Sequence, residues 1–297
     1  MRSLAPVLTV IAAILALWYA GAVALNAQWT RDQAARAGTT VTWPEIAADA
    51  MRQDRPRLPA PHQVAQEFWR TTWVEEVEGR RGIVQTGTLS NRSLVYHGWV
   101  TLSATVVGFA IGAGLGLLLA VGIVYNRAMD LGVMPWAIAS QTIPILAIAP
   151  MVIVVFASAG ITGLVPKAII SAYLSFFPVV VGMVKGLRSP DAMQLDQLRT
   201  WNASGWQEFW KLRLPASMPY LFTSLKVAIA ASLVGAIVGE IPVQQGGLGA
   251  RLLAGSYYGQ TAQIWAALIT AALLAGLLVG AIGAVQRVTL RRMGFAR

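Results

Sequence analysis

Apolar and polar positions divide the chain into long hydrophobic blocks separated by shorter polar intervals. Six blocks run over residues 7–25, 97–125, 137–156, 167–184, 220–241 and 264–285. About 20 apolar residues are enough to cross the hydrocarbon core of a bilayer as a helix. The pattern therefore predicts an all-α integral membrane protein with six transmembrane helices.

The first block has two interpretations. At residues 7–25 it is longer than a signal-peptide core of about 7–15 residues, which favours a retained helix. The small residues Ala22-Val23-Ala24 would nevertheless suit a signal peptidase, so cleavage stays open. We expect a transmembrane helix over residues 1–25.

Residues 26–96 have a different composition from the blocks around them. Charges of both signs alternate here, and prolines interrupt the segment. A solvated loop region of short helices is expected, one of them over His62–Trp69. Because long loops largely escape the charge rule for membrane orientation, the arginines of this segment are compatible with a periplasmic location. A core of five helices over residues 97–286 and a basic tail over 287–297 complete the predicted organisation.

Several residues within the later blocks are candidates for lining or gating a pathway through the membrane. Pro144, Pro150 and Pro178 interrupt apolar runs, and a proline frees a carbonyl and kinks a membrane helix. Phe177 precedes the last of these prolines. Glu240 is an acid at a span end, where it is either a gating group or a structural carboxylate bound to Arg251 or to a helix N-terminus.

One long polar interval, Asp191–Pro219, interrupts the second half of the chain. Pro190-Asp191 suits the first turn of one helix, and Asn202 or Ser204 suits the start of a second. Three aromatic residues, Trp206, Phe209 and Trp210, share one helical face, and Leu214-Pro215 is expected to end the helix. An exposed aromatic ridge of this kind would lie on lipid headgroups or insert into another protein.

Cations are distributed unequally between the two sides of the predicted bundle. The loops near residues 157–165 and 243–262 hold one arginine, Arg251. The termini and the other intervals carry most of the lysines and arginines outside residues 26–96. The positive-inside rule therefore places both termini and Asp191–Pro219 in the cytoplasm.

Composition excludes several other classes of protein. With 56% hydrophobic and 12% charged residues the chain is not an ordinary soluble domain, and its net charge of +10 fits the basic ends of membrane spans better than nucleic-acid binding. There is no cysteine, and two distant histidines give no metal-ligand set. No nucleophile–base pair points to an enzyme. The Gly246–Gly249 turn lacks the Gly-Lys-Ser/Thr of a phosphate-binding loop.

An ordered set of short motifs resembles the permease subunits of ABC importers of the binding-protein-dependent transport family, in the nitrate/sulfonate/taurine branch. The usual cytoplasmic frame is E-A-A, three residues, glycine, about nine residues, then I-x-L-P. Here Asp196-Gln197-Leu198, Asn202 and Leu212–Pro215 hold those places. The other matching pieces, in order, are Leu58–Pro61, His97 with Thr101-Leu102, Gly108-Phe109, Ile143-Pro144, Ala149-Pro150, Phe177-Pro178, Gly186–Arg188, Gly239-Glu240 and Gly247–Gly249.

The resemblance implies a function and a set of partners. The loop over residues 186–219 would form the coupling helix that seats in a separate ATP-hydrolysing subunit, which binds ATP and magnesium; this chain itself would carry no cofactor and be no enzyme. A periplasmic substrate-binding protein and a second permease copy or paralogue complete the implied assembly in the bacterial inner (cytoplasmic) membrane. The coupling residues carried over are Asp196, Gln197, Leu198, Asn202, Ala203, Ser204, Gly205, Glu208, Leu214 and Pro215.

This sequence departs from the usual frame at two places. Both alanines of E-A-A are absent, and Asn202 replaces the glycine. Asparagine tolerates left-handed and capping geometry, so a turn at Asn202 is still expected. The docked ATPase is therefore expected to be specific to this system.

The cargo and the energy source have open alternatives. The branch suggests nitrate, a sulfonate such as taurine, or a pyrimidine-type heterocycle. Because the predicted pathway holds few cations, a neutral heterocycle is slightly favoured. A secondary transporter driven by an ion gradient is the alternative class, but it would need more ionisable residues inside the spans than Glu240.

Overall fold

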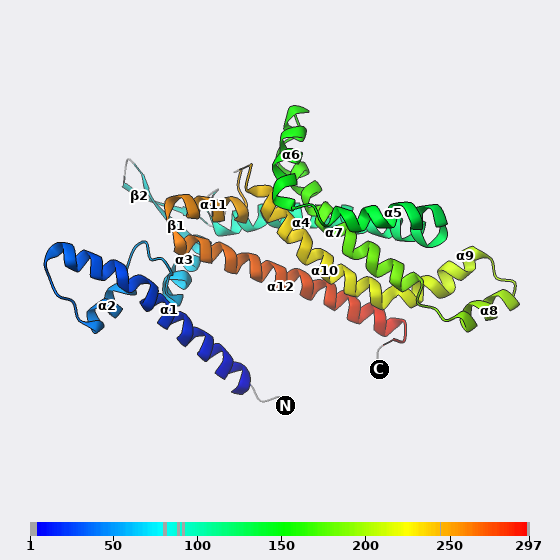
Figure 1. Ribbon diagram of the computed structural model, residues 1–297, viewed down its shortest axis with the longest axis horizontal. Coiled ribbons are helices and arrows are strands. Elements are labelled where there is room, and N and C mark those ends of the chain that lie inside the picture. The colour runs from blue at the N-terminus through cyan, green and yellow to red at the C-terminus, as the bar shows by residue number, and fades with distance from the viewer. Residues whose placement is uncertain (1–4, 80–81, 88–89, 91–92, 244, 296–297) are drawn as a thin grey trace. The chain divides into compact units, whose positions relative to one another are not determined.

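The structure is a computed structural model that describes residues 5–79, 82–87, 90, 93–243 and 245–295 (Figure 1). Its elements in chain order are α1 (Ala5–Ala37), α2 (Trp43–Ala50), α3 (Pro61–Trp73), β1 (Val74–Gly79), β2 (Gly82–Gly87), α4 (Leu94–Tyr125), α5 (Arg127–Ser140), α6 (Ile145–Ser158), α7 (Leu164–Leu187), α8 (Ala192–Thr200), α9 (Gly205–Glu208), the π-helix η1 (Phe209–Arg213), α10 (Leu214–Glu240), α11 (Leu248–Tyr258) and α12 (Thr261–Arg292). The chain forms two compact units. Unit 1 comprises residues 1–97 and 251–270, and unit 2 comprises 98–250 and 271–297.

The membrane-spanning character that the hydrophobic pattern predicted is confirmed. Within the described residues, five helical segments are long and apolar enough to cross a bilayer, and they correspond to α1, α4, α7, α9 through α10, and α12. The bent pair α5 and α6 provides a sixth if both helices count as one span. The small hairpin of β1 and β2 is an addition to the all-α expectation, with Val74 paired to Gly87.

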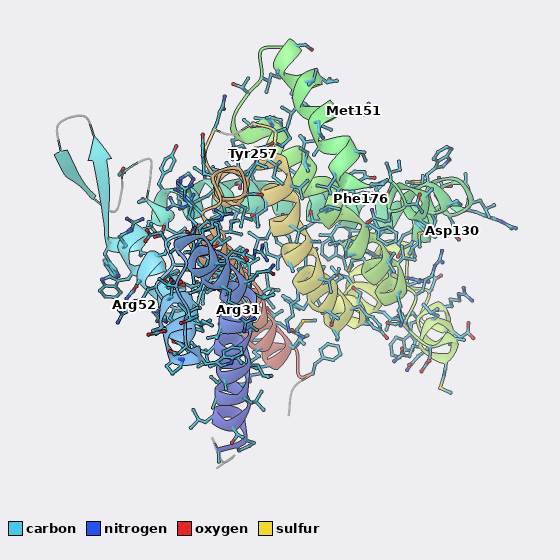
Figure 2. All side chains as sticks on the ribbon, turned by 60° about the vertical axis from the view of Figure 1, so that its left-hand side comes forward. Arg31, Arg52, Asp130, Met151, Phe176 and Tyr257 are labelled. Atoms are coloured by element: carbon cyan, nitrogen blue, oxygen red, sulfur yellow. The ribbon has the colours of Figure 1, made fainter. Side chains whose placement is uncertain are left out.

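The predicted span over residues 137–156 is not one helix. Instead α5 ends at Ser140, α6 begins at Ile145, and the two meet at 100°. Pro144 occupies the N-cap position of α6. Proline has no N–H to donate and restricts the residue before it to extended conformations, so the helix breaks there and does not merely kink. Both views show α6 projecting away from α7 and α10 (Figure 1 and Figure 2), and Figure 2 labels Met151 on it.

Unit 1 is organised by a buried asparagine at the end of the first apolar block. Asn26 is fully buried; its Nδ2 donates to the Leu58 carbonyl at 2.8 Å, and its Oδ1 accepts from the Arg57 N–H at 2.8 Å. The Trp18 indole donates to the Pro59 carbonyl at 3.0 Å. These bonds fasten the segment before α3 to α1, which continues past the predicted span to Ala37. Residues after the first block therefore form a folded body on α1, and α3 confirms the predicted short helix.

Unit 2 is held together by small residues on α4, α7 and α10. A Cβ built on Gly108 would lie 2.4 Å from the Ser171 Cβ, and one built on Gly235 would lie 2.7 Å from the Ser171 Cα. Side-chain hydroxyls bridge the helices at these contacts: Ser171 and Ser232 are 2.6 Å apart at Oγ, and the Ser232 hydroxyl donates to the Thr105 carbonyl at 2.8 Å. Close approach and interhelical hydrogen bonds are what associate helices where lipid gives no hydrophobic drive.

Candidate functional site

The polar interval between α7 and α10 forms a two-helix elbow, which we define as Asp191–Arg213. Asp191 is the N-cap of α8, and its N–H donates to the Gln194 side chain at 3.2 Å. Ser204 is the N-cap of α9: its Oγ accepts from the Gln207 N–H at 3.3 Å, and its own N–H donates to the Gln207 side chain at 3.0 Å. Because each cap satisfies an otherwise unpaired helix-end N–H, local sequence alone sets both helix starts.

The turn between α8 and α9 centres on Asn202. Its φ is +53°, the one positive value at a non-glycine residue in the described part of the chain. The Asn202 N–H donates to the Arg199 carbonyl at 2.9 Å, and the Ala203 N–H donates to the Leu198 carbonyl at 3.0 Å. This pair of bonds is the Schellman end of a helix, which requires a left-handed residue and usually takes glycine. Asparagine therefore performs the conformational role expected of the glycine it replaces.

The aromatic stripe of the elbow divides into an outward and an inward part. Trp206 is 71% exposed and Trp210 is 49% exposed. Phe209 packs edge-on against Tyr125 at the end of α4, with ring centroids 6.0 Å apart. Trp201, at the C-cap of α8, is also exposed. The elbow thus presents three indoles outward while Phe209 attaches it to the helical bundle.

The structure places the sequence-predicted coupling residues along the elbow and the first turn of α10. Those on the surface are Asp196, Gln197, Asn202, Ser204 and Gly205, and those half-buried are Leu198, Ala203, Glu208, Leu214 and Pro215. Asp196 pairs with Arg199 at 3.1 Å, both side chains being mostly exposed. The surface members face solvent on α8, the Asn202 turn and the start of α9, so they are available to a partner.

The prediction that Leu214-Pro215 ends the second helix is wrong. Helix α9 passes through η1 into α10 without a break, and Pro215 sits within the first two positions of α10. In η1 the Leu214 N–H donates to the Phe209 carbonyl, five residues back. A proline ring clashes with the carbonyl four residues earlier in a regular α-helix. The wider π turn shifts that carbonyl out of register, so the helix continues through the proline.

Arg213 makes one contact within the elbow and connects the elbow to two other places in unit 2. Its Nε donates to the Glu208 carboxylate at 2.5 Å, and its Nη1 donates to the Leu187 carbonyl at the end of α7 at 2.9 Å. Its guanidinium also lies over the Tyr125 ring of α4, 5.8 Å from the centroid. Only a planar guanidinium with several donors can make these contacts together. Sequence reasoning counted Arg213 as one more cation and missed this role.

A second cluster lies at the other end of α10, which we call the Glu240 turn: Glu240 with Gly246–Gly249. Glu240 is fully buried, and its Oε2 accepts from the Gly249 N–H at 2.8 Å in the first turn of α11. Gly247 has φ +108°, and a Cβ there would lie 2.1 Å from the Glu240 Cδ. The structure thus gives Glu240 the helix N-terminus as its partner. In unit 1, Arg251 has an oxygen of Glu67 at 3.9 Å.

Two further side chains fasten the Glu240 turn to other helices. The Thr101 hydroxyl of α4 accepts from the Leu248 N–H at 2.9 Å and is also hydrogen-bonded to Glu240. Lys167 of α7 is buried and donates to the Gly246 carbonyl at 3.4 Å. Thr101 entered the sequence analysis only as part of a motif. No periodicity in the sequence relates it to Glu240, so its role emerges from the fold.

The four pathway candidates other than Glu240 occupy two separate places. Phe177 and Pro178 line a largely apolar groove of about 620 Å³ between α7 and α10, whose polar lining includes Lys185, Tyr220 and Thr223. Pro144 and Pro150 lie instead at the start of α6 and inside it. The structure therefore brings Phe177 and Pro178 together in one groove and leaves Pro144 and Pro150 outside it.

These features define a multi-pass α-helical membrane protein with a capped aromatic elbow continuous with one of its spans. Residues 112–294 match the family described as binding-protein-dependent transport system inner membrane component. The chain belongs to this family of ABC transporter permeases, which confirms the resemblance found in the sequence.

Three relatives of the chain are named for different solutes. The chain is 31% identical over 167 residues to the formylaminopyrimidine transport permease protein ThiX of Halalkalibacterium halodurans, covering 56% of this chain and 65% of that relative. It is 29% identical to the riboflavin transport system permease protein RibX of Chloroflexus aurantiacus, covering 79% of this chain and 80% of that relative. It is 25% identical to the putative aliphatic sulfonates transport permease protein SsuC of Bacillus subtilis, covering 66% of this chain and 69% of that relative.

Among solved structures, the chain resembles one from the inward-facing conformations of the MetNI methionine ABC transporter. The TM-score is 0.55 at 20% identity, over 66% of this chain and 95% of that one. At this identity the likeness concerns the fold, and it confirms the helical permease architecture.

Proposed function

We propose that the chain is the membrane permease subunit of an ATP-driven importer that moves a small solute from an external binding protein into the cytoplasm by alternating access. The observation that carries the proposal is the elbow. Its outward tryptophans, Trp206 and Trp210, stand on a helix that continues through η1 into a membrane-spanning helix. A partner that moves the elbow would therefore move α10.

The partner at the elbow is proposed to be a separate ATP-hydrolysing subunit. Tryptophan is among the residues that most often dominate the binding energy of protein interfaces, and the elbow exposes its indoles on a capped segment. Displacement of α9 would pass along the helix axis, while Arg213 would transmit it to the ends of α7 and α4. An elbow on lipid headgroups would need no such connection to the bundle. ATP and magnesium would be bound by the partner.

The proposed orientation places the elbow and both termini in the cytoplasm of a bacterium, with the chain in the inner membrane. It rests on the lysines and arginines of the elbow and of the end of α12, since cations accumulate at the cytoplasmic ends of spans. In this orientation residues 26–96 would face the periplasm, where a substrate-binding protein would dock, and the Glu240 turn would lie at the periplasmic end of α10. A second permease copy or a paralogue would complete the pathway.

We further propose a pyrimidine-type heterocycle as the transported solute, ahead of nitrate or a sulfonate. The groove between α7 and α10 supports this class, because Phe177 and Tyr220 offer aromatic faces and Thr223 a hydroxyl among mostly apolar walls. Planar rings with few hydrogen-bonding groups suit such a lining. Two of the three relatives described above are named for ring compounds, formylaminopyrimidine and riboflavin. In this proposal Glu240 is not a gating group: its carboxylate anchors the Glu240 turn.

The experiment removes the outward indoles without disturbing the fold. Trp206→Ala with Trp210→Ala should weaken co-purification of the ATPase subunit with the tagged permease by at least about tenfold, because interface tryptophans contribute about 2 kcal/mol or more each. ATP-dependent uptake should fall in parallel, while the amount of permease in the membrane stays constant. Trp69→Ala is the matched control, since that indole is 67% exposed on α3.

Two results would contradict the proposal. Retention of the ATPase by the double variant would show that the elbow is not the docking surface. Uptake driven by an ion gradient in vesicles without ATP would indicate a secondary transporter. Glu208 is a poorer target, because its carboxylate is bound to Arg213 and its replacement disturbs the elbow itself.

A further inference from the structure

A second groove, of about 560 Å³, lies between α10 and the arginine-bearing end of α12 within unit 2. Its lining includes Lys226 from α10 and, from α12, Gly280, Gly283, Gln286, Arg287 and Arg291. It shares no residue with the groove of Phe177 and Pro178 and none with the elbow. The proposed transport function leaves it unexplained.

The groove exists because two glycines leave the facing side of α12 without side chains. A Cβ built on Gly283 would be 3.6 Å from the Lys226 Cε, an ordinary contact distance. A Cβ on Gly280 would meet no described atom within 4 Å. A larger side chain at either position would project into the space now open between the two helices. The end of this space beside Val279 and Gly280 is lined by apolar residues.

The opposite end of the groove carries three cations, Lys226, Arg287 and Arg291. In the described residues, no salt bridge involves Lys226, Arg287 or Arg291. The sequence after Glu240 contains no aspartate or glutamate at all. The three cations therefore require a negative charge that this part of the chain does not supply.

The usual accumulation of cations at a span end accounts for part of this pattern only. It explains Arg287, Arg291 and Arg292, which are exposed in the last turns of α12. It does not explain Lys226, which stands between Leu225 and Val227 inside the apolar run of α10 and is half-buried. An ionisable residue within a span is costly and is kept where it faces a partner or a cavity. Here the Lys226 side chain reaches Gly283, at the edge of the groove.

We propose that this groove binds one anionic phospholipid from the surrounding bilayer. Arg291 lies eight positions after Gly283, so the cationic part extends about 12 Å along α12 at about 1.5 Å per residue. That length accommodates a phosphate headgroup between Lys226 and Arg287, with Arg291 beyond it. An acyl chain would lie along Gly283, Gly280 and Val279. Basic pockets between transmembrane helices are known to bind acidic headgroups in this way.

The binding experiment uses the full chain purified in a neutral detergent and dioctanoyl phosphatidylglycerol as the probe, with binding measured by native mass spectrometry. Lys226→Gln and Arg287→Gln should each weaken binding about fivefold, since each cation near an anionic lipid contributes that factor. Arg292→Gln is the matched control, because Arg292 neighbours Arg291 on α12 but does not line the groove. It should change the affinity less than about twofold, as should replacement of a distant exposed cation.

A third variant tests the apolar half without changing charge. Gly283→Leu should fill the groove and abolish phosphatidylglycerol binding while the three cations remain. If Lys226→Gln or Gly283→Leu fails to fold, the double variant Arg287→Gln with Arg291→Gln decides the question, because both side chains are exposed.

Several outcomes would overturn the proposal. Equal binding of phosphatidylcholine would mean that the cations recognise no headgroup. Displacement of the lipid by inorganic phosphate would indicate a site for a free anion. If Arg292→Gln lowered the affinity for phosphatidylglycerol as much as Arg287→Gln does, the effect would come from general surface charge. Unchanged binding in Gly283→Leu would mean that the lipid binds elsewhere. Binding that disappears only when the chain dimerises would assign the groove to a second copy.

Discussion

The elbow and the Glu240 turn lie at opposite ends of the same helix, α10, and are built in opposite ways. The elbow is exposed, and its shape comes from caps and turns between residues a few positions apart, such as Ser204 with Gln207. The Glu240 turn is buried and joins residues far apart in sequence, such as Thr101 with Leu248. The difference fits the proposal that the elbow is a surface for a partner, while the Glu240 turn is an internal anchor.

Helix α10 connects the two regions mechanically. Its first turn follows η1 directly, and its last residue is Glu240. At each end a single cation fastens α10 or its neighbouring segment to α7: Arg213 to the Leu187 carbonyl, and Lys167 to the Gly246 carbonyl. We infer that the buried end fixes α10, while a force on the exposed elbow reaches α10 along the helix and reaches α7 through Arg213. The following substitutions test that contrast.

The largest effect is expected at the anchor. Gly247→Ala should destabilise the chain by more than about 3 kcal/mol, because its backbone is left-handed and the new Cβ would overlap the Glu240 carboxyl group. Thermal unfolding of the solubilised protein measures this change. Gly276→Ala on α12, where an added Cβ meets no described atom within 4 Å, should shift stability by less than about 0.5 kcal/mol. Equal melting temperatures for both variants would refute the anchor.

An intermediate effect is expected at the attachment of the elbow. Arg213→Gln should lower ATP-dependent uptake about tenfold, since it removes charge-assisted hydrogen bonds to Glu208 and Leu187 that contribute about 1.5–3 kcal/mol. Arg199→Gln is the control, because its ion pair with Asp196 is exposed and should contribute almost nothing. A double-mutant cycle with Glu208→Gln should give a coupling of about 1–2 kcal/mol. Additive effects would show that Arg213 acts elsewhere.

The smallest effect is expected in the elbow turn. Asn202→Gly should preserve uptake and change stability by a few tenths of a kcal/mol, because glycine adopts the same left-handed conformation. Asn202→Val should cost about 1–2 kcal/mol, since a β-branched side chain disfavours positive φ. Thermal unfolding and uptake together separate the two. A valine variant as stable as the natural chain would mean that the turn does not need its left-handed residue.

The sequence predicted those features that arise from local or periodic signals. The alternation of apolar blocks with polar intervals located the membrane spans, and the N-cap residues located the starts of both helices of the elbow. The left-handed turn at Asn202 was foreseen from the tolerance of asparagine for that conformation. The family frame, although altered at Gln197, Leu198 and Asn202, led to the family that the comparison confirmed.

The errors fell where a proline could be accommodated in more than one way. Pro144 was expected to kink a span and instead separates α5 from α6 at 100°. Pro215 was expected to end a helix and instead lies in a continuous one, because η1 absorbs the register change. The sequence shows that a hydrogen bond is missing, but the neighbouring backbone decides whether the helix bends, breaks or widens.

By itself, the sequence therefore determined the class of the protein, the number of apolar segments and the capped elbow, because those depend on composition and on residues within a turn or two of each other. Tertiary structure alone decided what Glu240, Arg213 and Lys226 contact. Glu240 contacts Gly249 across a turn, Arg213 contacts Leu187 at the end of α7, and Lys226 lies beside Gly283 of α12. Such pairings depend on how the helices pack, and no periodicity along one helix records which residue of another will face it.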